Sequence, residues 1–136
     1  MFLLDTNVLS ELRRRERTHP KVAAWVDTVH AADLYLSVIT ILEFEAGTLQ
    51  LARRDAAQGR VLRAWIDGKV MPAFADRILP IDTAVAQCCA RLHVPDPRAE
   101  RDALIAATAL IHGMRVVTRN VADFQPMGVD LLNPWD

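Results

Sequence analysis

Short apolar runs alternate with longer amphipathic stretches along most of this chain. Five of the runs are rich in leucine, isoleucine and valine, as buried strands are: residues 2–5, 34–39, 77–81, 114–118 and 129–132. The stretches between them carry apolar residues three or four positions apart, which indicates helices packed on a sheet. Strands that alternate with helices predict βαβ units, and therefore an α/β fold with a mostly parallel sheet.

Local signals predict where the helices of the first half begin. A short helix is expected over Val8–Arg15, and Pro20, in the favoured first-turn position, opens the next one. Thr40 and Glu43 have the spacing of a capping box, which predicts that a third helix begins at Thr40 and runs past Leu51.

Similar signals divide the second half of the chain. Further helical sequence follows the third helix, with a break expected near Gly59, and another helix is expected over residues 83–92. Asp96 followed by Pro97 is a typical helix start, and the helix that it opens is expected to end at Gly113.

Composition narrows the class of protein. A chain of 136 residues with 51% hydrophobic side chains predicts one compact domain, residues 1–136, with its own core. The adjacent Cys88 and Cys89 have no metal-ligand or redox spacing, so we expect reduced thiols on a helix and a cytoplasmic protein. Neither a signal peptide nor a membrane span is predicted. The net charge of −1 argues against a protein that coats nucleic acid non-specifically.

Four acidic residues lie near the points where apolar runs meet polar sequence, and each also has a purely structural interpretation. Asp5 follows the first strand and could cap the next helix, while Asp123 follows the fourth strand and could be an ordinary turn residue. Glu43 could serve only the capping box. Asp102 lies about six residues into its expected helix, where a carboxylate needs either a partner or solvent.

The four acids together predict a divalent metal site. The carboxyl ends of parallel strands meet at one edge of a sheet, where ligands bind, so we expect these side chains to gather there. Gathered carboxylates repel one another unless a cation lies among them. A set of oxygen ligands favours Mg²⁺ or Mn²⁺ over zinc. The chain has no histidine pair at metal-binding spacing, no glycine-rich phosphate loop and no serine nucleophile motif.

Several segments resemble the PIN-domain ribonuclease toxins of the VapC family, in the same order and spacing over essentially the whole chain. The similar segments are residues 4–12, 102–108, 117–124 and 132–135. The resemblance implies a parallel sheet flanked by helices and an endoribonuclease that depends on Mg²⁺ or Mn²⁺. It implies catalytic and metal-binding roles for Asp5, Glu43, Asp102 and Asp123, supported by Thr6, Asn7, Thr118 and Asn120.

One part of this assignment stays open in the sequence. Glu45 lies two residues after Glu43, and either glutamate could face the metal, although the Thr-x-x-Glu spacing favours Glu43.

The same resemblance implies partners. They are an RNA substrate, a cognate VapB-like antitoxin, and a second copy of the chain in a homodimer and a higher toxin–antitoxin assembly, with DNA contacted only through the antitoxin. We expect the antitoxin to place an apolar helix in a groove between the first helix (Val8, Leu9, Leu12) and the helix over Ile41–Leu51. Five clustered arginines are predicted to contact RNA phosphates, with solvated helix faces as the alternative: Arg13, Arg14, Arg15, Arg53 and Arg54.

Two other functions fit parts of the sequence. A haloacid-dehalogenase-type phosphatase also begins with an apolar strand that ends in Asp, but it needs a second Asp where this chain has Asn7, and a helix-borne Lys that has no evident counterpart. A catalytically silent PIN-fold binding module would keep the fold without cleaving RNA. Metal-stimulated RNA cleavage distinguishes the enzyme from the binding module.

Overall fold

A five-stranded parallel sheet forms the centre of the computed structural model, which describes residues 1–136. The strand order is β3-β2-β1-β4-β5, so the first strand is the central one. All five predicted strands are present, although each is shorter than its apolar run: β1 Phe2–Leu4, β2 Leu34–Ser37, β3 Ile78–Leu79, β4 Arg115–Val117 and β5 Leu131–Leu132. The predicted α/β class with a parallel sheet is confirmed.

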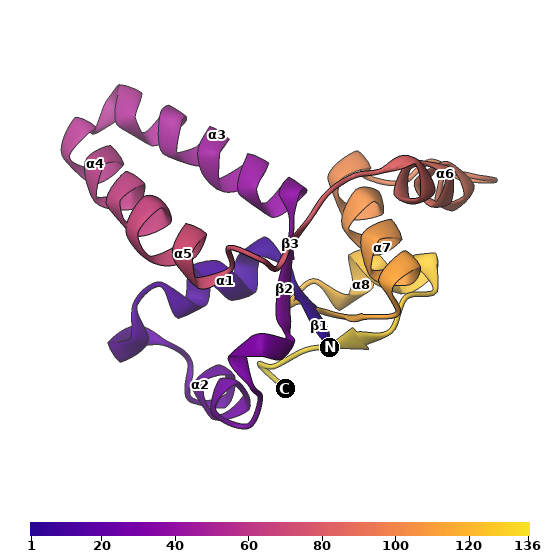
Figure 1. Cartoon of the computed structure of the whole chain (residues 1–136), viewed down its shortest axis with the longest axis horizontal. Coiled ribbons are helices and arrows are strands. Elements are labelled where there is room, and N and C mark those ends of the chain that lie inside the picture. Colours follow the sequence, from indigo (N-terminus) through magenta and orange to yellow (C-terminus); the bar gives the residue numbers. More distant parts are fainter.

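Helices cover both faces of the sheet, with α1 to α5 on one side and α6 to α8 on the other (Figure 1). The first group comprises α1 Thr6–Leu12, α2 Pro20–Asp27, α3 Val38–Arg54, α4 Ala56–Trp65 and α5 Met71–Ala73. The second comprises α6 Thr83–Leu92, α7 Glu100–His112 and α8 Val121–Phe124. Single helical turns, among them η3 Ile66–Val70 between α4 and α5, join some of these elements. None of the helices is both long and apolar enough to cross a bilayer.

Neighbouring residues of the central strands supply the two halves of the core. Leu3 and Val116 belong to the buried cluster on the α6–α8 side, whereas Leu4 and Val117 belong to the cluster on the α1–α5 side. Successive side chains of a strand point to opposite faces, so a sheet covered on both sides needs continuous apolar runs. These runs end together at the carboxyl edge, where Asp5 and Thr118 follow the last strand residues.

The start of α3 differs from the prediction. Ser37, the last residue of β2, accepts a hydrogen bond from the backbone N–H of Ile39 at 3.0 Å and caps the helix, which therefore begins at Val38. The expected capping box is wrong, because Thr40 and Glu43 both lie inside the helix. Glu43 is therefore not needed to satisfy a helix terminus.

The turn between α3 and α4 also differs from the prediction. The break falls at Asp55, whose side chain accepts a hydrogen bond from Gln58 N at 3.1 Å and caps α4. Gly59 lies within α4 and is buried; a Cβ atom there would come within 2.6 Å of the Cβ of Ala52. Glycine is required at this position by the close approach of two helices, not by a change of chain direction.

Two further helix starts are corrected by the structure. The helix expected from Asp96 begins at Glu100 instead, with Ala99 as its N-terminal flanking residue, and it ends at Gly113 (φ +66°) as predicted. Asp102 consequently lies in the first turn of α7. The first helix begins at Thr6, two residues before the expected start, because Asp5 caps it directly.

Candidate functional site

Asp5 lies at the centre of the carboxyl edge of the sheet and is 5% exposed. Its Oδ1 accepts a hydrogen bond from Thr6 N at 2.8 Å and caps α1. Its Oδ2 accepts one from Thr118 Oγ1 at 2.8 Å and another from Asn7 Nδ2 at 3.3 Å. The capping interpretation of Asp5 therefore holds, but the same carboxylate also joins the ends of β1 and β4.

A polar network surrounds Asp5 and connects three segments of the chain: residues 5–7, residues 118–120 and, through Thr6 Oγ1, Glu43 of α3. Thr118 Oγ1, besides donating to Asp5, accepts hydrogen bonds from Asn120 N at 2.9 Å and from Asn7 Nδ2 at 3.3 Å. Asn7 Oδ1 in turn accepts one from Arg119 N at 3.3 Å. Of the four residues predicted to support the acids, Thr6, Asn7 and Thr118 contribute side chains to this network, while Asn120 contributes its backbone N–H.

Glu43 reaches the same edge from the second turn of α3. Its Oε1 accepts a hydrogen bond from Thr6 Oγ1 at 2.7 Å, and its Oε2 lies 3.9 Å from a guanidinium nitrogen of Arg101. Glu45 instead forms two hydrogen bonds with Arg63, at 2.6 and 3.0 Å, and these hold the pKa of Glu45 below its usual range. The structure therefore places Glu43 beside Asp5, whereas Glu45 forms an ion pair with Arg63.

The other two acids approach from the opposite side of the sheet. Asp102 is half-buried in the first turn of α7, and Asp123 is exposed on α8, a short helix where a turn was expected. Both carboxylates lie near enough to Asp5 for their charges to influence its surroundings. All four predicted acids thus share one electrostatic environment at the carboxyl edge.

The pKa values report unfavourable electrostatics in this environment. Burial raises the pKa of Asp5, and the charges of Glu43 and Asp123 raise it further, outweighing the hydrogen bonds from Thr118 and Thr6 that lower it. Burial also raises the pKa of Asp102, to which the charges of Asp5, Asp123 and Glu43 add. No cationic side chain compensates Asp5 or Asp102. A bound cation would therefore offset both the cost of burying these charges and the repulsion between them.

The spread of the carboxylates limits how an ion could be held. No three of these four acids bring ligand atoms within 4.8 Å of one another. An ion at this edge would accordingly be held by one or two carboxylates and complete its shell with water. Mg²⁺ is commonly bound in this manner, because it keeps several of its waters. The all-oxygen donor set and the uncompensated charge therefore fit a hard divalent cation.

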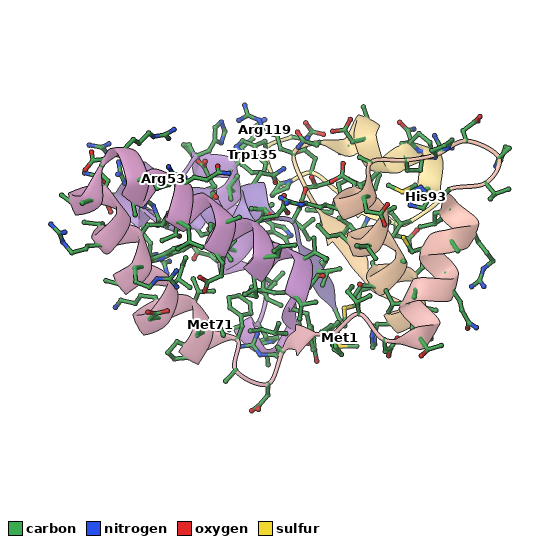
Figure 2. The ribbon with its side chains drawn as sticks, turned by 90° about the horizontal axis from the view of Figure 1, so that it is seen from above. Met1, Arg53, Met71, His93, Arg119 and Trp135 are labelled. Carbon is green, nitrogen blue, oxygen red and sulfur yellow. The ribbon has the colours of Figure 1, made fainter.

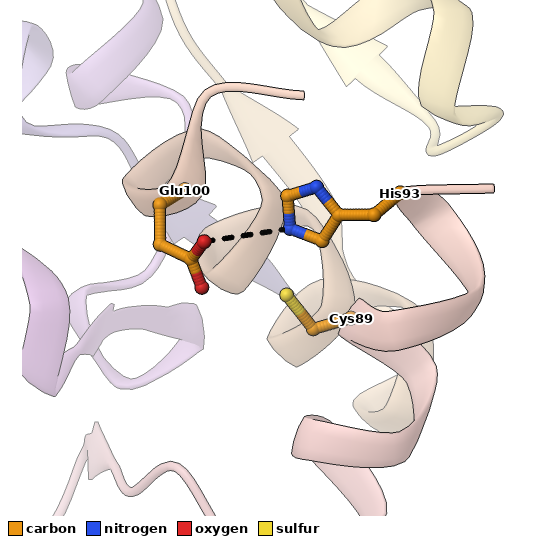
Figure 3. A group of neighbouring side chains, drawn as sticks. All are labelled: Cys89, His93 and Glu100. Atoms are coloured by element: carbon orange, nitrogen blue, oxygen red, sulfur yellow. Dashed lines mark ion pairs between the residues drawn. The ribbon is translucent and has the colours of Figure 1, made fainter. Parts of the chain in front are cut away.

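A second group of potential metal ligands was missed in the sequence. Cys89, His93 and Glu100 bring one ligand atom each within 4.8 Å of one another, where the end of α6 meets the start of α7 (Figure 3). Cys89 and His93 are four residues apart, one helical turn, which is the signal that could have found them. The predicted location of the cysteines on a helix is confirmed, since both are buried on α6, and neither forms a disulfide.

The hydrogen bonding of His93 opposes metal binding in this arrangement. Its Nδ1 accepts the backbone N–H of Arg98 at 3.0 Å, so in the neutral ring the proton lies on Nε2, 3.8 Å from a carboxylate oxygen of Glu100. A histidine that binds a metal through Nε2 carries its proton on Nδ1 instead. Burial also raises the pKa of the Cys89 thiol. The group is consequently a contact between two helices, and its hydrogen bonding does not favour a metal site.

The five arginines predicted to contact RNA lie in two separate places. Arg53 and Arg54 are exposed at the far end of α3, about 16 Å along the helix from Glu43 at 1.5 Å per residue. Figure 2 shows Arg53 on the α3–α4 side, away from the labelled Arg119 and Trp135. Arg13 and Arg15 line an apolar groove beside α1, and Arg14 is exposed next to them.

That groove has a different second wall from the one predicted. It has a volume of about 460 Å³, with Leu9 and Leu12 of α1 on one side, but the facing residues come from the α4–α5 segment and not from α3. Val8, which was expected to line the groove, is fully buried and is not among its lining residues. The facing residues are Trp65, Lys69, Val70, Ala73 and Phe74. The groove therefore has an apolar floor, with Arg13, Arg15 and Lys69 among its lining residues.

Comparison with known proteins adds independent findings. The PIN domain family matches residues 2–125 of the chain. The chain is 38% identical to "VapC ribonuclease Y4jK" of Sinorhizobium fredii over 142 residues, covering 100% of this chain and 99% of that protein. It is 37% identical to "Toxin FitB" of Neisseria gonorrhoeae, covering 99% of each. The crystal structure of FitAcB from Neisseria gonorrhoeae superposes with a TM-score of 0.89 at 37% identity, covering 99% of both chains.

Proposed function

The chain belongs to the PIN-domain family, and from this membership we propose that it is a Mg²⁺- or Mn²⁺-dependent endoribonuclease, the toxin of a type II toxin–antitoxin pair. The observation that carries the proposal is the buried Asp5, hydrogen-bonded to Thr118 and accompanied by three further acids with no compensating cation of its own. The relatives named as ribonuclease and toxin support the activity and the role. Membership of this family argues against the phosphatase alternative.

The metal would be held by one or two of the carboxylates of Asp5, Asp102, Asp123 and Glu43. When bound, it lowers the pKa of a water ligand and neutralises charge on the phosphodiester. Thr118 and Thr6 fix the Asp5 carboxylate through hydrogen bonds to its two oxygens, so Asp5 enters the reaction already oriented. This fixed geometry is the contribution of the fold to the chemistry.

Proton transfer is assigned to Asp5 or Glu43. A base works best when its pKa lies near the working pH, and burial moves the pKa of Asp5 in that direction. The attacking water adds to phosphorus as its proton passes to the carboxylate, the bond from phosphorus to the 3′-oxygen breaks, and the departing 3′-oxygen takes up a proton from solvent. The products carry a 5′-phosphate and a 3′-hydroxyl.

The expected substrate is single-stranded or looped RNA, because a side chain reads bases most readily where they are unpaired. The backbone carries one negative charge per nucleotide, so the acidic edge needs both the metal and nearby cationic side chains to accept it.

The apolar groove beside α1 fits the partner that this role requires. Its floor of leucine, valine and aromatic side chains can accept the apolar face of a helix, and Arg13, Arg15 and Lys69 suit acidic residues flanking that face. We propose that a VapB-like antitoxin helix binds here and directs an arginine or lysine to the carboxylates. Homodimerisation, a higher assembly and contact with DNA through the antitoxin alone belong to the same proposal.

Cleavage of a total-RNA pool by antitoxin-free protein tests the activity. Discrete fragments are expected with Mg²⁺ or Mn²⁺ and none with EDTA. Asp5→Asn is expected to reduce turnover by about 10³-fold or more, because oriented carboxylates at the reacting centre contribute on this scale. Asp82→Asn is the matched control: Asp82 also caps a helix, through Val85 N at 2.9 Å, but it does so at the start of α6.

The two variants separate capping from catalysis, because asparagine caps a helix about as well as aspartate does. Normal cleavage by Asp82→Asn and none by folded Asp5→Asn supports the proposal. Equal cleavage by Asp5→Asn and the wild type contradicts it, and folded wild-type protein that cuts no RNA with either metal points to the silent binding module.

A further inference from the structure

Arg119 is an arginine at the carboxyl edge that none of the acids neutralises. It directly follows Thr118, and its backbone N–H donates to Asn7, which also donates to Asp5. Its guanidinium takes part in no ion pair and no hydrogen bond with the rest of the protein. Arg101, the other arginine adjoining these acids, lies 3.9 Å from Glu43 and is thereby engaged.

An aromatic ring holds the Arg119 guanidinium. The guanidinium carbon lies 5.3 Å from the ring centroid of Trp135, and Figure 2 shows the two residues side by side. Trp135 packs against the core cluster on the α1–α5 side, and its backbone N–H donates to Asn133 Oδ1 at 3.0 Å. The indole is therefore a fixed support for a cation at the end of β4, one residue after the hydroxyl that orients Asp5, and this cation pairs with none of the acids.

This geometry leaves the hydrogen-bonding part of the arginine available. A cation–π contact uses the flat face of the guanidinium, whereas its N–H groups lie around the edge. Those N–H groups match the paired oxygens of a phosphate, and stacking on a fixed ring reduces the freedom that would be lost on binding. The side chain is exposed, so a ligand can reach it.

We infer that Arg119, held by Trp135, binds a backbone phosphate of the RNA strand next to the one that is cut, and so positions the strand over the acids. The inference rests on the proposed ribonuclease function and names a substrate contact for it. Trp135 acts through Arg119 and is a positioning residue. Arg119 was not among the arginines selected from the sequence, because those were chosen by clustering and Arg119 stands alone.

RNA binding tests the inference without turnover. Asp5→Asn protein, which leaves the RNA intact, is titrated with a fluorescent single-stranded oligoribonucleotide in Mg²⁺ at several salt concentrations. Adding Arg119→Ala is expected to weaken binding about ten-fold and to reduce the slope of log affinity against log salt by about 0.7, the value for one lost phosphate contact on a single strand. Arg91→Ala, an exposed arginine on α6, serves as the control and should change neither quantity.

Three further variants give readouts that a merely structural role would not produce. Arg119→Lys should keep the salt slope but lose part of the affinity, since lysine keeps the charge and lacks the planar fork. Trp135→Leu should weaken binding less than Arg119→Ala does. The double variant should bind like Arg119→Ala alone, because Trp135 acts only through the arginine. Melting curves confirm that each variant is folded.

The outcomes are distinguishable from a failure of the proposed function. Wild-type protein that cleaves RNA, with an Arg119→Ala variant that keeps wild-type affinity and slope, overturns the inference and leaves the ribonuclease standing. Additive effects of Arg119→Ala and Trp135→Leu overturn the positioning role of Trp135. Arg119→Ala should weaken the binding of a single-stranded DNA of equal length by the same factor, because the contact is to phosphate. Loss of binding to an antitoxin peptide, with RNA binding unchanged, assigns the guanidinium to the other partner and overturns the inference.

Discussion

Two glutamates on one helix, two residues apart, show how differently this molecule treats negative charge. Glu45 is paired directly with Arg63, which also lies 3.4 Å from Asp67, so each of these carboxylates has a cationic partner that is partly open to solvent. Glu43 faces three aspartates across the carboxyl edge, with Thr6 as its only hydrogen-bond donor and Arg101 at 3.9 Å. The first region uses carboxylates to hold two helices together. The second keeps carboxylates close to one another although they repel, as a cation-binding site does.

The largest difference is expected in the rate of RNA cleavage. Glu43→Gln should lower turnover by about 10²–10³-fold, because it removes a carboxylate beside Asp5 that serves metal binding or proton transfer. Glu45→Gln should leave turnover within about two-fold, which makes it the matched control on the same helix. Single-turnover assays with saturating Mg²⁺ measure both. Similar losses in the two variants would contradict the distinction between the regions.

Metal binding should stabilise one region and not the other. Saturating Mg²⁺ is expected to raise the free energy of unfolding of the wild type by up to about 2.7 kcal/mol at a hundred times its Kd. The gain should shrink in Glu43→Gln and persist in Glu45→Gln. Urea unfolding with and without Mg²⁺ measures it, and NaCl at matched ionic strength separates specific binding from charge screening. A gain that is equal in all three proteins would place the ion elsewhere.

The pH dependence of stability should reveal the repulsion around Asp102. Its pKa is raised in the folded state, so between the unfolded value near 3.8 and the folded value the folded protein binds more protons. Stability contributed by this group is present below that window and is lost as the pH rises through it. Asp102→Asn should therefore raise the melting temperature of the metal-free protein at pH 7.5 by a few degrees. It should have little effect at pH 3.5; the reverse pattern would show that Asp102 is stabilised by its neighbours.

The smallest effect is expected where the carboxylates have a cationic partner. Arg63→Ala removes the partner of Glu45, and we expect a slight fall in the melting temperature, because exposed ion pairs contribute little to stability. High salt should reduce the difference from the wild type by screening the pair. Cleavage activity should stay unchanged. A large loss of activity would mean that Arg63 keeps Glu45 away from the acidic edge.

The sequence predicted the strands and the acids better than the helix starts and the isolated contacts. The strands were evident because a sheet covered on both faces needs uninterrupted apolar residues, and Asp5 marks where one such run ends. The start of α3 was misplaced because Ser37 serves both as the last strand residue and as the helix cap. A capping-box spacing at Thr40 carries no information about a better cap three residues earlier.

Contacts between distant segments had no comparable signal. Arg119 and Trp135 meet only because β4 and β5 are adjacent and in register, with Val117 opposite Leu132. Similarly, the choice between Glu43 and Glu45 depended on Arg63 of α4, whose position follows from where the chain turns at Asp55. Such pairings depend on the assembled fold, which local spacing does not describe.

Because of the strand order, this site can form only late in the translation of the chain. β1 forms the centre of the sheet, yet one of its two neighbours is β4, whose residues are made more than one hundred positions later. At roughly 5–20 residues per second, Asp5 waits on the order of 6–23 s for the segment that carries Thr118 and Asp123. A nascent chain released early lacks one of the four carboxylates and the hydroxyl that orients Asp5. If the chain has the proposed ribonuclease function, interrupted synthesis would yield fragments with an incomplete site, and complete sites would form only when translation is nearly finished.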